Sequence, residues 1–285
     1  MVEATHRPVT SFVRRSPRMN DSQRAALLRL GGRFLLDGLQ RDTMETLFVA
    51  QQPIDLDRSF GRHAPLLVEI GCGSGENLAA AATASPDWNL LGFEVYDKVL
   101  ASTMSRLERA DAGNVRLVRG DAVTGFQFLL APGSITELHT YFPDPWHKAR
   151  HAKRRLINPG FVTLAASRLL PGRLWRLATD WDDYAAHIRG VFADDAVAPL
   201  FDDVTGSEAG WQRPQTKFEA RAHAAGRIVT EIVYRRTAVS AGGSAGVSPA
   251  TGRAISSTGD STGSARGSAG VSPATGSTTG EGAEG

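Results

Sequence analysis

The chain has 285 residues, a length that suits one large domain or a small pair of domains. Its formal net charge is only +2, so any affinity for a polyanion must come from local clusters of charge. The single cysteine, Cys72, excludes an internal disulfide framework and a zinc site built from several cysteines. No apolar run approaches the ~20 residues that cross a bilayer, and the basic N-terminus lacks the apolar core of a signal peptide. A cytoplasmic protein is therefore expected.

Composition divides the chain into three parts. Residues 1–20 are polar and basic, whereas residues 21–237 carry the apolar patterning of a folded domain. From residue 238 onward there is no aromatic side chain, and the decapeptide GSAGVSPATG occurs twice, at 243–252 and 267–276. Such a segment has too little apolar surface to offset its ordering entropy. We therefore interpret 238–285 as a disordered, low-complexity tail.

Between the arm and the tail, apolar runs alternate with helical patterns. A first helix is predicted from Asn20 or Asp21 through Leu30, and the pattern is then poor to about residue 64. The apolar runs predict strands, at 66–70, 89–95, 115–120, 135–142, 173–179 and 227–235. Helices are predicted at 76–84, 97–110 and 123–130, from Asn158 with Pro159 in the first position, and at 182–192. The alternation predicts an α/β fold with a doubly wound, mostly parallel sheet, whose ligands bind at the carboxyl ends of the strands.

The stretch LLVEIGCGSGEN places Gly71, Gly73 and Gly75 between a predicted strand and a predicted helix. Glycines there let the backbone turn tightly and let a ligand approach it closely. A dinucleotide fingerprint needs its third glycine one place later, where Glu76 would repel a pyrophosphate. The loop therefore favours a cofactor without phosphates, of which S-adenosylmethionine is the common one, over NAD or FAD. A turn without a ligand is the alternative, and Cys72 is interpreted as a small filler rather than a nucleophile.

Carboxylates stand at the ends of three successive predicted strands. Glu69 ends the first strand and could meet the amino group or the sulfonium of the cofactor. Glu94 ends the second, where an acid accepts hydrogen bonds from both ribose hydroxyls. Asp121 follows the third, where the adenine amine could donate to it. Three such strand ends favour a bound cofactor over a turn without a ligand.

The fourth predicted strand leads into the run YFPDPWHKARHAKRRL, which begins at Tyr141. Pro143 and Pro145 restrict Asp144, between them, to an extended backbone, and such rigidity suits a group that acts in a site. Trp146 offers a flat face on which a base could stack, and it could equally fill the core. These residues leave both interpretations of Trp146 open.

Five fixed positive charges follow within eight residues, at Lys148, Arg150, Lys153, Arg154 and Arg155. A charge run is often a solvated helix face, but this one adjoins the expected cofactor crevice. Positive charge at that place would attract a polyanion, because each phosphate contact releases counterions. The arginines of the N-terminal arm could extend the same surface, at Arg14, Arg15 and Arg18.

Together these motifs closely resemble those of the tRNA (guanine-N7)-methyltransferases. Four segments match motifs of the family: EIGCGSGE, GFEVY, GDA and the run from Tyr141. Two more match in the same order, ATDWDDYA and TKFEAR. The N-terminal SFVRR is also similar, so the resemblance spans residues 11–236, and the tail has no counterpart. The chain departs at Ala149, Ala222 and Arg227, where a basic residue, a glycine and a histidine are frequent. These departures concern RNA affinity and the C-terminal loop rather than the reaction.

The resemblance implies a class I methyltransferase sheet, S-adenosylmethionine without a metal, and a guanine in the variable loop of tRNA as the substrate. It implies that the glycine loop and the strand-end acids bind the cofactor together with Asp144, which is also the implied catalytic residue. The positions that it assigns to substrate and RNA contact are Lys148, Arg150, His151, Lys153, Arg154, Arg155, Asp180, Thr216, Lys217, Phe218 and Glu219. Bacterial members act without an accessory subunit, so a monomer or weak homodimer that binds tRNA and no membrane is expected.

The chemistry leaves the individual roles of the acids open. N7 of guanine carries no proton and needs no general base, so catalysis should rest on positioning and electrostatics. Asp144 could stabilise the positive charge on the methylated guanine, hold the guanine edge or face the cofactor. Asp180 and Glu219 are rival candidates for the guanine edge. Asp180 could instead cap the helix at 182–192, and Glu219 could instead pair with Arg221.

Two other functions fit parts of the sequence. A methyltransferase could act on a base amine, a protein or a small molecule. Base-amine enzymes often carry an acid or amide followed by two prolines and an aromatic residue, whereas here Asp144 lies between its prolines, and a small acceptor would not explain the basic run. A non-catalytic RNA-binding protein could keep the fold, but the glycine loop and the strand-end acids argue against it.

Overall fold

The computed structural model describes residues 10–13, 18–36, 38–42, 46–49, 52–208, 211 and 213–238, and all of them belong to one compact unit, 1–243. Almost all of the predicted tail lies outside the described residues, as do Arg14 and Arg15 of the predicted arm. No helix in the described part of the chain is long and apolar enough to cross a membrane.

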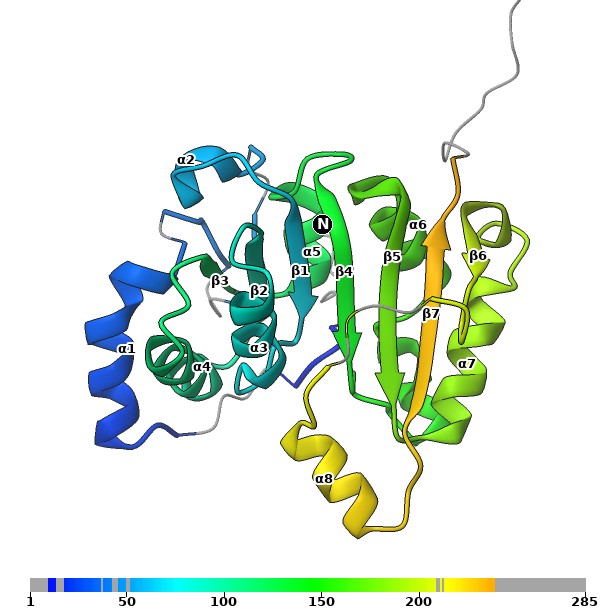
Figure 1. Cartoon of the computed structure of the whole chain (residues 1–285). Helices are drawn as coiled ribbons and strands as arrows, with labels where there is room; N and C mark the ends of the chain where they lie inside the picture. The colour runs from blue at the N-terminus through cyan, green and yellow to red at the C-terminus, as the bar shows by residue number, and fades with distance from the viewer. Residues whose placement is uncertain are drawn as a thin grey trace, which may run out of the picture. The chain divides into compact units, whose positions relative to one another are not determined.

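Seven strands in the described residues form one sheet (Figure 1). They are β1 (Leu66–Ile70), β2 (Asn89–Glu94), β3 (Val115–Arg119), β4 (Ile135–Tyr141), β5 (Leu169–Thr179), β6 (Phe201–Asp203) and β7 (Thr230–Arg236). Their order is β3-β2-β1-β4-β5-β7-β6, with β1 to β5 parallel and β7 antiparallel to both of its neighbours. The predicted α/β fold with a doubly wound, mostly parallel sheet is confirmed. Chain order reverses between β1 and β4, and ligands of such sheets bind beside the carboxyl ends at this reversal.

Helices cover the sheet, and polar caps fix where several of them begin. The α-helices of the described residues are α1 (Asp21–Phe34), α2 (Leu56–Phe60), α3 (Glu76–Ala84), α4 (Asp97–Arg109), α5 (Ala122–Phe128), α6 (Pro159–Arg168), α7 (Asp182–Phe192) and α8 (Lys217–Ala224), and two 3₁₀ helices are η1 (Ala149–Arg154) and η2 (Ala198–Leu200). Asn20 forms a capping box with Gln23 at the start of α1. Asn158 accepts the backbone N–H of Phe161 over 3.1 Å, and Pro159 stands first in α6, as predicted.

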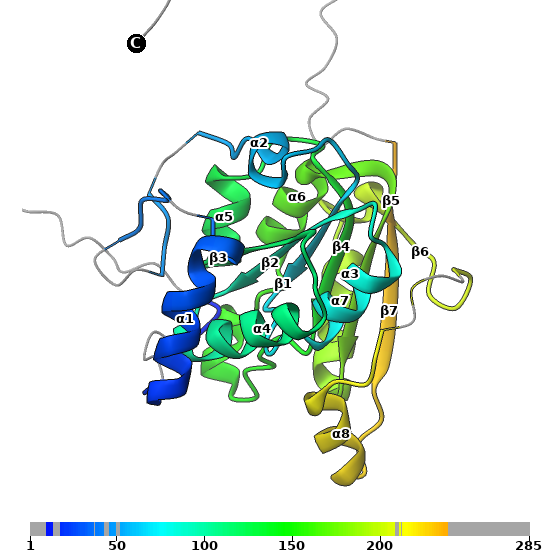
Figure 2. The ribbon, with the colours of Figure 1, turned by 60° about the vertical axis from the view of Figure 1, so that its left-hand side comes forward.

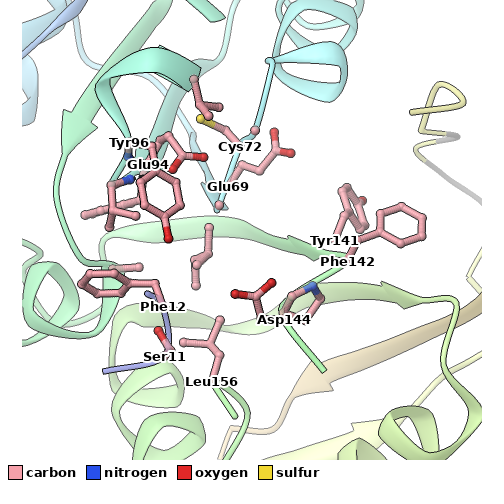
Figure 3. Close-up of a pocket in the computed structure, with 18 of the residues that line it drawn as sticks. Ser11, Phe12, Glu69, Cys72, Glu94, Tyr96, Tyr141, Phe142, Asp144 and Leu156 are labelled. Carbon is pink, nitrogen blue, oxygen red and sulfur yellow. Dashed lines mark hydrogen bonds between the residues drawn. The ribbon is translucent and has the colours of Figure 1, made fainter. Parts of the chain in front are cut away.

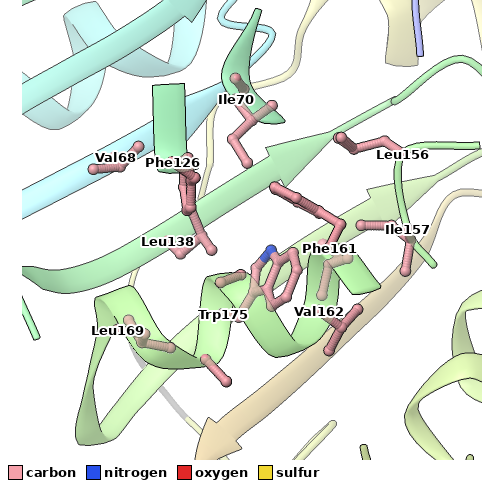
Figure 4. Packing of buried hydrophobic residues seen from close by; sticks show 14 of the residues in the cluster. Val68, Ile70, Phe126, Leu138, Leu156, Ile157, Phe161, Val162, Leu169 and Trp175 are labelled. Carbon is pink, nitrogen blue, oxygen red and sulfur yellow. The ribbon is translucent and has the colours of Figure 1, made fainter. Parts of the chain in front are cut away.

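Two apolar clusters lie on opposite faces of the sheet, because successive side chains of a strand point to opposite sides. Leu67 of β1 packs with α1, α3 and α4, which lie in front of the sheet in Figure 1. Val68, the next residue, packs with α5, α6 and α7 behind it, and Figure 2 shows the same layers from the side. Trp175 lies fully buried in this second cluster, edge-on to Phe161 (Figure 4). The strand ends that carry the site are thus held from both faces.

The structure differs from the predicted elements mainly at their ends. Helix α1 runs one turn past Leu30 to Phe34, because both side chains are buried against the sheet and its helices. Strand β5 begins earlier than predicted, at Leu169, and its pairing with β4 shifts register there. Strand β7 begins later, at Thr230, because Gly226 adopts a positive φ of 68° in the turn that precedes it. The short elements α2, η1, β6 and α8 are not predicted by the hydrophobic pattern at all.

Candidate active site

A pocket of about 340 Å³ opens at the carboxyl ends of β1, β2 and β4 (Figure 3). Its wall comes from the glycine loop, the ends of β2 and β3, the loop after β4, the start of α8 and two N-terminal residues, Ser11 and Phe12. The predicted site residues that line it are Glu69, Gly71, Gly73, Glu94, Asp121, Asp144, Thr216, Lys217 and Phe218. The pocket therefore brings together side chains from both ends of the described chain.

The glycine loop has the backbone that its spacing predicts. Gly71, Gly73 and Gly75 all have positive φ angles, of 68°, 55° and 75°. A Cβ atom at Gly71 or Gly73 would meet nothing closer than 3.8 Å and would enter the pocket space. At Gly75 a Cβ would lie 2.7 Å from the Thr103 side chain, so that glycine serves the packing of α3 against α4. Cys72 is buried and its thiol pKa is raised by that burial, as befits a filler.

Glu69 is the deepest acid of the pocket. Its side chain is buried, and its Oε2 accepts a hydrogen bond from Nδ2 of Asn77 over 3.0 Å. Burial raises the pKa of Glu69 to about 8, against the lowering effect of Asn77, and the nearby Glu76 raises it further. A cationic group bound beside Glu69 would favour its ionised form and lower this raised pKa.

Glu94 lies at the end of β2 and is held by backbone donors. Its Oε1 accepts the N–H groups of Val95 at 2.8 Å and of Tyr96 at 3.0 Å. Burial raises the pKa of Glu94 to about 7, while these backbone N–H groups and the charge of Lys217 act to lower it. The carboxylate is thereby oriented before any ligand is bound.

Asp121 has two functions in the structure. Its Oδ2 accepts the backbone N–H of Thr124 over 2.9 Å, so it caps α5. The same side chain lines the pocket at the end of β3. The third strand-end acid is therefore fixed by the helix that follows it.

The loop after β4 projects Asp144 into the pocket, where Figure 3 shows its carboxylate. Phe142 and Trp146 on either side of the Pro-Asp-Pro unit have positive φ angles of 52° and 46°, which are strained for such residues. The carbonyl of Pro145 accepts a hydrogen bond from Nε of Arg155 over 2.9 Å. Surrounding protein raises the pKa of Asp144 by desolvation, and the charge of Arg154 acts against this. Within the described part of the chain, no hydrogen bond occupies the Asp144 carboxylate.

Trp146 anchors the N-terminal segment instead of offering a free face. Its indole N–H donates to the carbonyl of Ser11 over 3.0 Å, and the Arg154 guanidinium lies 3.8 Å from its ring centre. Arg154 also donates to the carbonyls of Thr10 and Phe12. The Phe12 side chain is 7% exposed and lines the pocket. The indole is therefore used within the protein, and residues 10–13 complete the site.

The basic run divides into inward and outward side chains. Arg154 holds the N-terminal segment, and Arg155 donates to Pro145 and to Asp183, leaving its side chain 11% exposed. His151 packs edge-on against Trp146. The remaining cations of the run are exposed and form no ion pair within the described residues, namely Lys148, Arg150 and Lys153.

The two rival acids lie outside the pocket and are paired. Asp180 accepts a hydrogen bond from Nε of Arg227 over 2.8 Å. The cap position of α7 is Trp181, without a side-chain cap, so the alternative interpretation of Asp180 as the helix cap is wrong. Glu219 forms an ion pair with Arg213 at 2.6 Å, so the expected partner, Arg221, is wrong.

The segment that starts α8 closes one side of the pocket. Thr216 caps α8 by accepting the N–H of Glu219 over 3.2 Å. Lys217 donates to the hydroxyl of Ser74 in the glycine loop. Phe218 is 44% exposed at the pocket wall, and its ring lies nearly parallel to that of Phe142, 6.2 Å between centres. A flat apolar surface thus stands beside the acids.

Comparisons with known proteins identify the family. The model of a family described as "Putative methyltransferase" matches residues 63–232. A tRNA (guanine-N(7)-)-methyltransferase of Cutibacterium acnes is 46% identical over 236 residues, covering 82% of this chain and 85% of the relative. The chain belongs to the tRNA (guanine-N7)-methyltransferase family. Its counterpart in Bordetella pertussis is 40% identical over 235 residues, covering 82% of this chain and 86% of its own. Among solved structures, an aminoglycoside resistance methyltransferase has a TM-score of 0.44 and 14% identity over 68% of this chain and 97% of its own, a likeness too weak to add to the assignment.

In this methyltransferase, the residues that the motifs identify form two groups: one inside the pocket and one around its mouth. Among the described residues, no group of histidine, cysteine and carboxylate side chains gathers as a metal site would. Sequence reasoning missed Phe12, Tyr96 and Asn77 as pocket residues. The available signals are their places in quoted motifs: Phe12 in SFVRR, Tyr96 at the end of GFEVY and Asn77 at the end of LLVEIGCGSGEN.

Proposed function

We infer that this chain transfers the methyl group of S-adenosylmethionine to N7 of a guanine in the variable loop of tRNA. The observation that carries the proposal is the position of Asp144. It projects into the glycine-loop pocket from a loop that leads directly to exposed cations. One short segment therefore joins a cofactor pocket to a surface for nucleic acid, in a chain of this family.

The pocket fits the proposed cofactor in shape and in charge. S-adenosylmethionine supplies a methyl group carried on a positively charged sulfur. Glu69 is the buried acid that would accept its cationic part, and Glu94 would accept from its ribose hydroxyls. The open space at Gly71 and Gly73 lets the ligand approach the backbone. Among the described residues that line the pocket, Lys217 is the single Lys or Arg side chain and acids outnumber it, which fits a cofactor without phosphates.

The residues at the mouth fit a guanine acceptor. N7 attacks with its own lone pair, so the protein needs to orient the base and stabilise the positive charge that appears on it. Asp144 has an accessible carboxylate at this place, and it would stabilise the cation or accept from the N–H groups of the guanine edge. The exposed ring of Phe218 offers a surface on which a base could stack. The proposed contribution of Asp144 to methyl transfer is therefore the charge of its carboxylate and not the removal of a proton.

Lys148, Arg150 and Lys153 are the proposed contacts to the tRNA backbone, because they are exposed next to the Asp144 loop. Arg154, Arg155 and His151 are proposed to act indirectly, by holding the N-terminal segment and the loop in place. Asp180 and Glu219 are proposed to hold Arg227 and Arg213 rather than the base. We further infer a cytoplasmic enzyme that acts as a monomer or weak homodimer without an accessory subunit.

Incubation with unmodified tRNA and methyl-labelled cofactor tests the proposal, followed by aniline cleavage, which cuts at 7-methylguanosine. Label at one variable-loop guanine with cleavage there is the expected result. Label that resists cleavage would instead indicate methylation of another base atom. Absence of label despite cofactor binding by calorimetry would overturn tRNA as the acceptor, and absence of cofactor binding would favour an RNA-binding protein without activity.

A further inference from the structure

A buried polar chain runs behind the pocket and ends on Glu69. Nδ2 of Asn77 lies 3.0 Å from Oε2 of Glu69 and 3.1 Å from Nδ1 of His139. Nε2 of His139 lies 3.0 Å from Oε1 of Glu137, which also accepts from Nε of Arg176 over 2.7 Å. His139 is fully buried, and Asn77 is 1% exposed. Polar groups buried this deeply are costly unless each is paired, and a fully paired network holds its side chains in fixed orientations.

The orientation of the Asn77 amide is determined by its partners. The indole N–H of Trp211 can only donate, and it lies 2.8 Å from Oδ1 of Asn77. The amide nitrogen therefore faces Glu69 and His139, and its two hydrogens serve these two acceptors. Since Nδ1 of His139 accepts, Nε2 carries the proton and donates to Glu137. Each hydrogen bond in this set then has one assigned donor and one assigned acceptor, with no conflict between them.

The other members of this set act on Glu69 only through the neutral amide of Asn77. Glu137 and Arg176 neutralise each other, and burial lowers the pKa of His139, which keeps its ring neutral. Within the described residues, the amide of Asn77 is the one side-chain donor to Glu69. Because both amide hydrogens are taken, Asn77 has no donor left for a ligand. Its N–H groups can act on the cofactor only by way of Glu69.

Trp211 connects this chain to the segment that leads into α8. It is partly buried and packs on the same apolar cluster as α3, which carries Asn77. Farther along that segment, Lys217 bonds to Ser74 and lines the pocket beside Glu94. The hydrogen bond from Trp211 therefore ties the segment next to the substrate to the amide behind the cofactor acid.

We propose that Asn77 is a positioning residue for the cofactor: it holds the Glu69 side chain in the orientation that receives S-adenosylmethionine, and Trp211 fixes Asn77 in turn. The proposal rests on the proposed function, because it takes S-adenosylmethionine to be the ligand of Glu69. Neither residue touches the reacting atoms, so their loss should affect cofactor affinity more than turnover.

The test compares cofactor binding and turnover in the full chain. Asn77→Ala removes the donor to Glu69 and should raise the Kd of S-adenosylmethionine by about tenfold or more, the usual value of a hydrogen bond to a charged group. At saturating cofactor, kcat should fall much less. Asn77→Ser keeps a short donor and should recover part of the affinity. Trp211→Phe removes only the indole N–H and should raise the Kd by a smaller factor.

A double-variant cycle tests whether Trp211 acts through Asn77. The chain with Asn77→Ala and Trp211→Phe should bind no more weakly than the chain with Asn77→Ala alone. Trp88→Phe is the matched control, because Trp88 packs on the same cluster and no hydrogen bond of its indole N–H is found in the described part of the chain. It should bind the cofactor as the wild type does.

Three outcomes would overturn parts of the proposal. An unchanged Kd in both Asn77→Ala and Trp211→Phe chains would overturn it as a whole, and the partly buried Trp211 keeps this readout available if Asn77→Ala fails to fold. Additive losses in the double variant would overturn the role of Trp211. If the wild-type chain bound no S-adenosylmethionine, both the proposed function and this proposal would fail. If the wild-type chain bound it and the variants had the same Kd, only this proposal would fail.

Discussion

The acids inside the pocket and the cations around its mouth are built in opposite ways. Glu69, Glu94 and Asp121 each stand at a strand end, are buried, and are oriented by donors a few residues away in sequence. The cations after Asp144 lie in one short run, yet they have different surroundings. Arg154 and Arg155 point inward onto backbone carbonyls, whereas Lys153 beside them is exposed. Equal charge in the sequence therefore does not mean an equal role.

This difference has a physical origin. A parallel sheet fixes where its strand ends lie, so an acid at such an end has a predictable position. A loop between two strained residues, Phe142 and Trp146, needs its own supports, and guanidinium groups supply them through several directed N–H donors. Lysine has a single ammonium group without this directed set of donors, so it suits such a support less well. Arg154 and Arg155 therefore support the loop, and the outward cations serve its ligand.

Replacing Asp144, where the two groups meet, should have the largest effect. Asp144→Asn removes the charge that stabilises the cationic product while keeping the shape of the side chain. We expect kcat to fall by about a hundredfold or more, as for other lost electrostatic groups in active sites. The Kd of S-adenosylmethionine should change little. Asp195→Asn, an exposed acid outside the pocket, is the control. Unchanged turnover in the Asp144 variant would show that the charge of this acid is not used.

Arg155→Ala and Lys153→Ala test the division within the basic run. Loss of Arg155 leaves the carbonyl of Pro145 without its donor, so the Asp144 loop should loosen and kcat should fall by about tenfold. Lys153→Ala should leave kcat unchanged. Arg155→Lys keeps the charge but not the paired donors, so it should behave like Arg155→Ala. A full recovery of kcat in Arg155→Lys would mean that charge, not loop support, is what Arg155 provides.

Replacing the three outward cations together by alanine should weaken tRNA binding without affecting chemistry. The apparent KM for tRNA should rise several-fold at moderate salt, and the dependence of log KM on log salt concentration should become shallower by about two units or more, since each lost phosphate contact removes about 0.7 to 0.9. The cations concerned are Lys148, Arg150 and Lys153. An unchanged salt dependence would place the RNA surface elsewhere on the molecule.

The pH dependence of stability should report the raised pKa of the buried acid Glu69. The folded-state pKa of Glu69 is about 8, above its ordinary 4.5, because burial outweighs the donor Asn77 and Glu76 adds repulsion. The proton is therefore bound more tightly in the folded chain, and this contribution to stability is complete below pH 4.5 and is lost as the pH rises to about 8. Melting temperatures of the ligand-free wild type should fall over this window relative to those of Glu69→Gln, which mimics the protonated acid. Parallel curves for the two chains would contradict the raised pKa.

The sequence predicts most of the fold and the cofactor side of the site. Strand β1 and helices α3 and α7 occur at their predicted bounds, because a short buried run and the hydrophobic pattern of a helix are local signals. The positions of the glycine loop and of the acids Glu69 and Glu94 could be predicted too, because they depend on where the strands end.

The mouth of the site depends on contacts between distant segments, and no local pattern encodes them. The N-terminal residue Phe12 reaches the pocket only because Trp146 and Arg154 hold its neighbours. Helix α8 is short and weakly patterned, so its contribution through Lys217 and Phe218 is visible in the sequence only as a family motif. The same holds for the partner of Glu219, which is Arg213 rather than a neighbour on its own helix.

Methylation of a tRNA in which 7-deazaguanine replaces the variable-loop guanine tests the central claim most directly. The replacement exchanges N7 for a C–H group and leaves the hydrogen-bonding edge of the base unchanged. If the pocket acids and Asp144 serve attack by N7, the wild-type enzyme should label the unmodified tRNA and transfer no methyl group to the 7-deaza nucleotide. Methyl transfer to that nucleotide would show that another atom is the acceptor and would contradict the account.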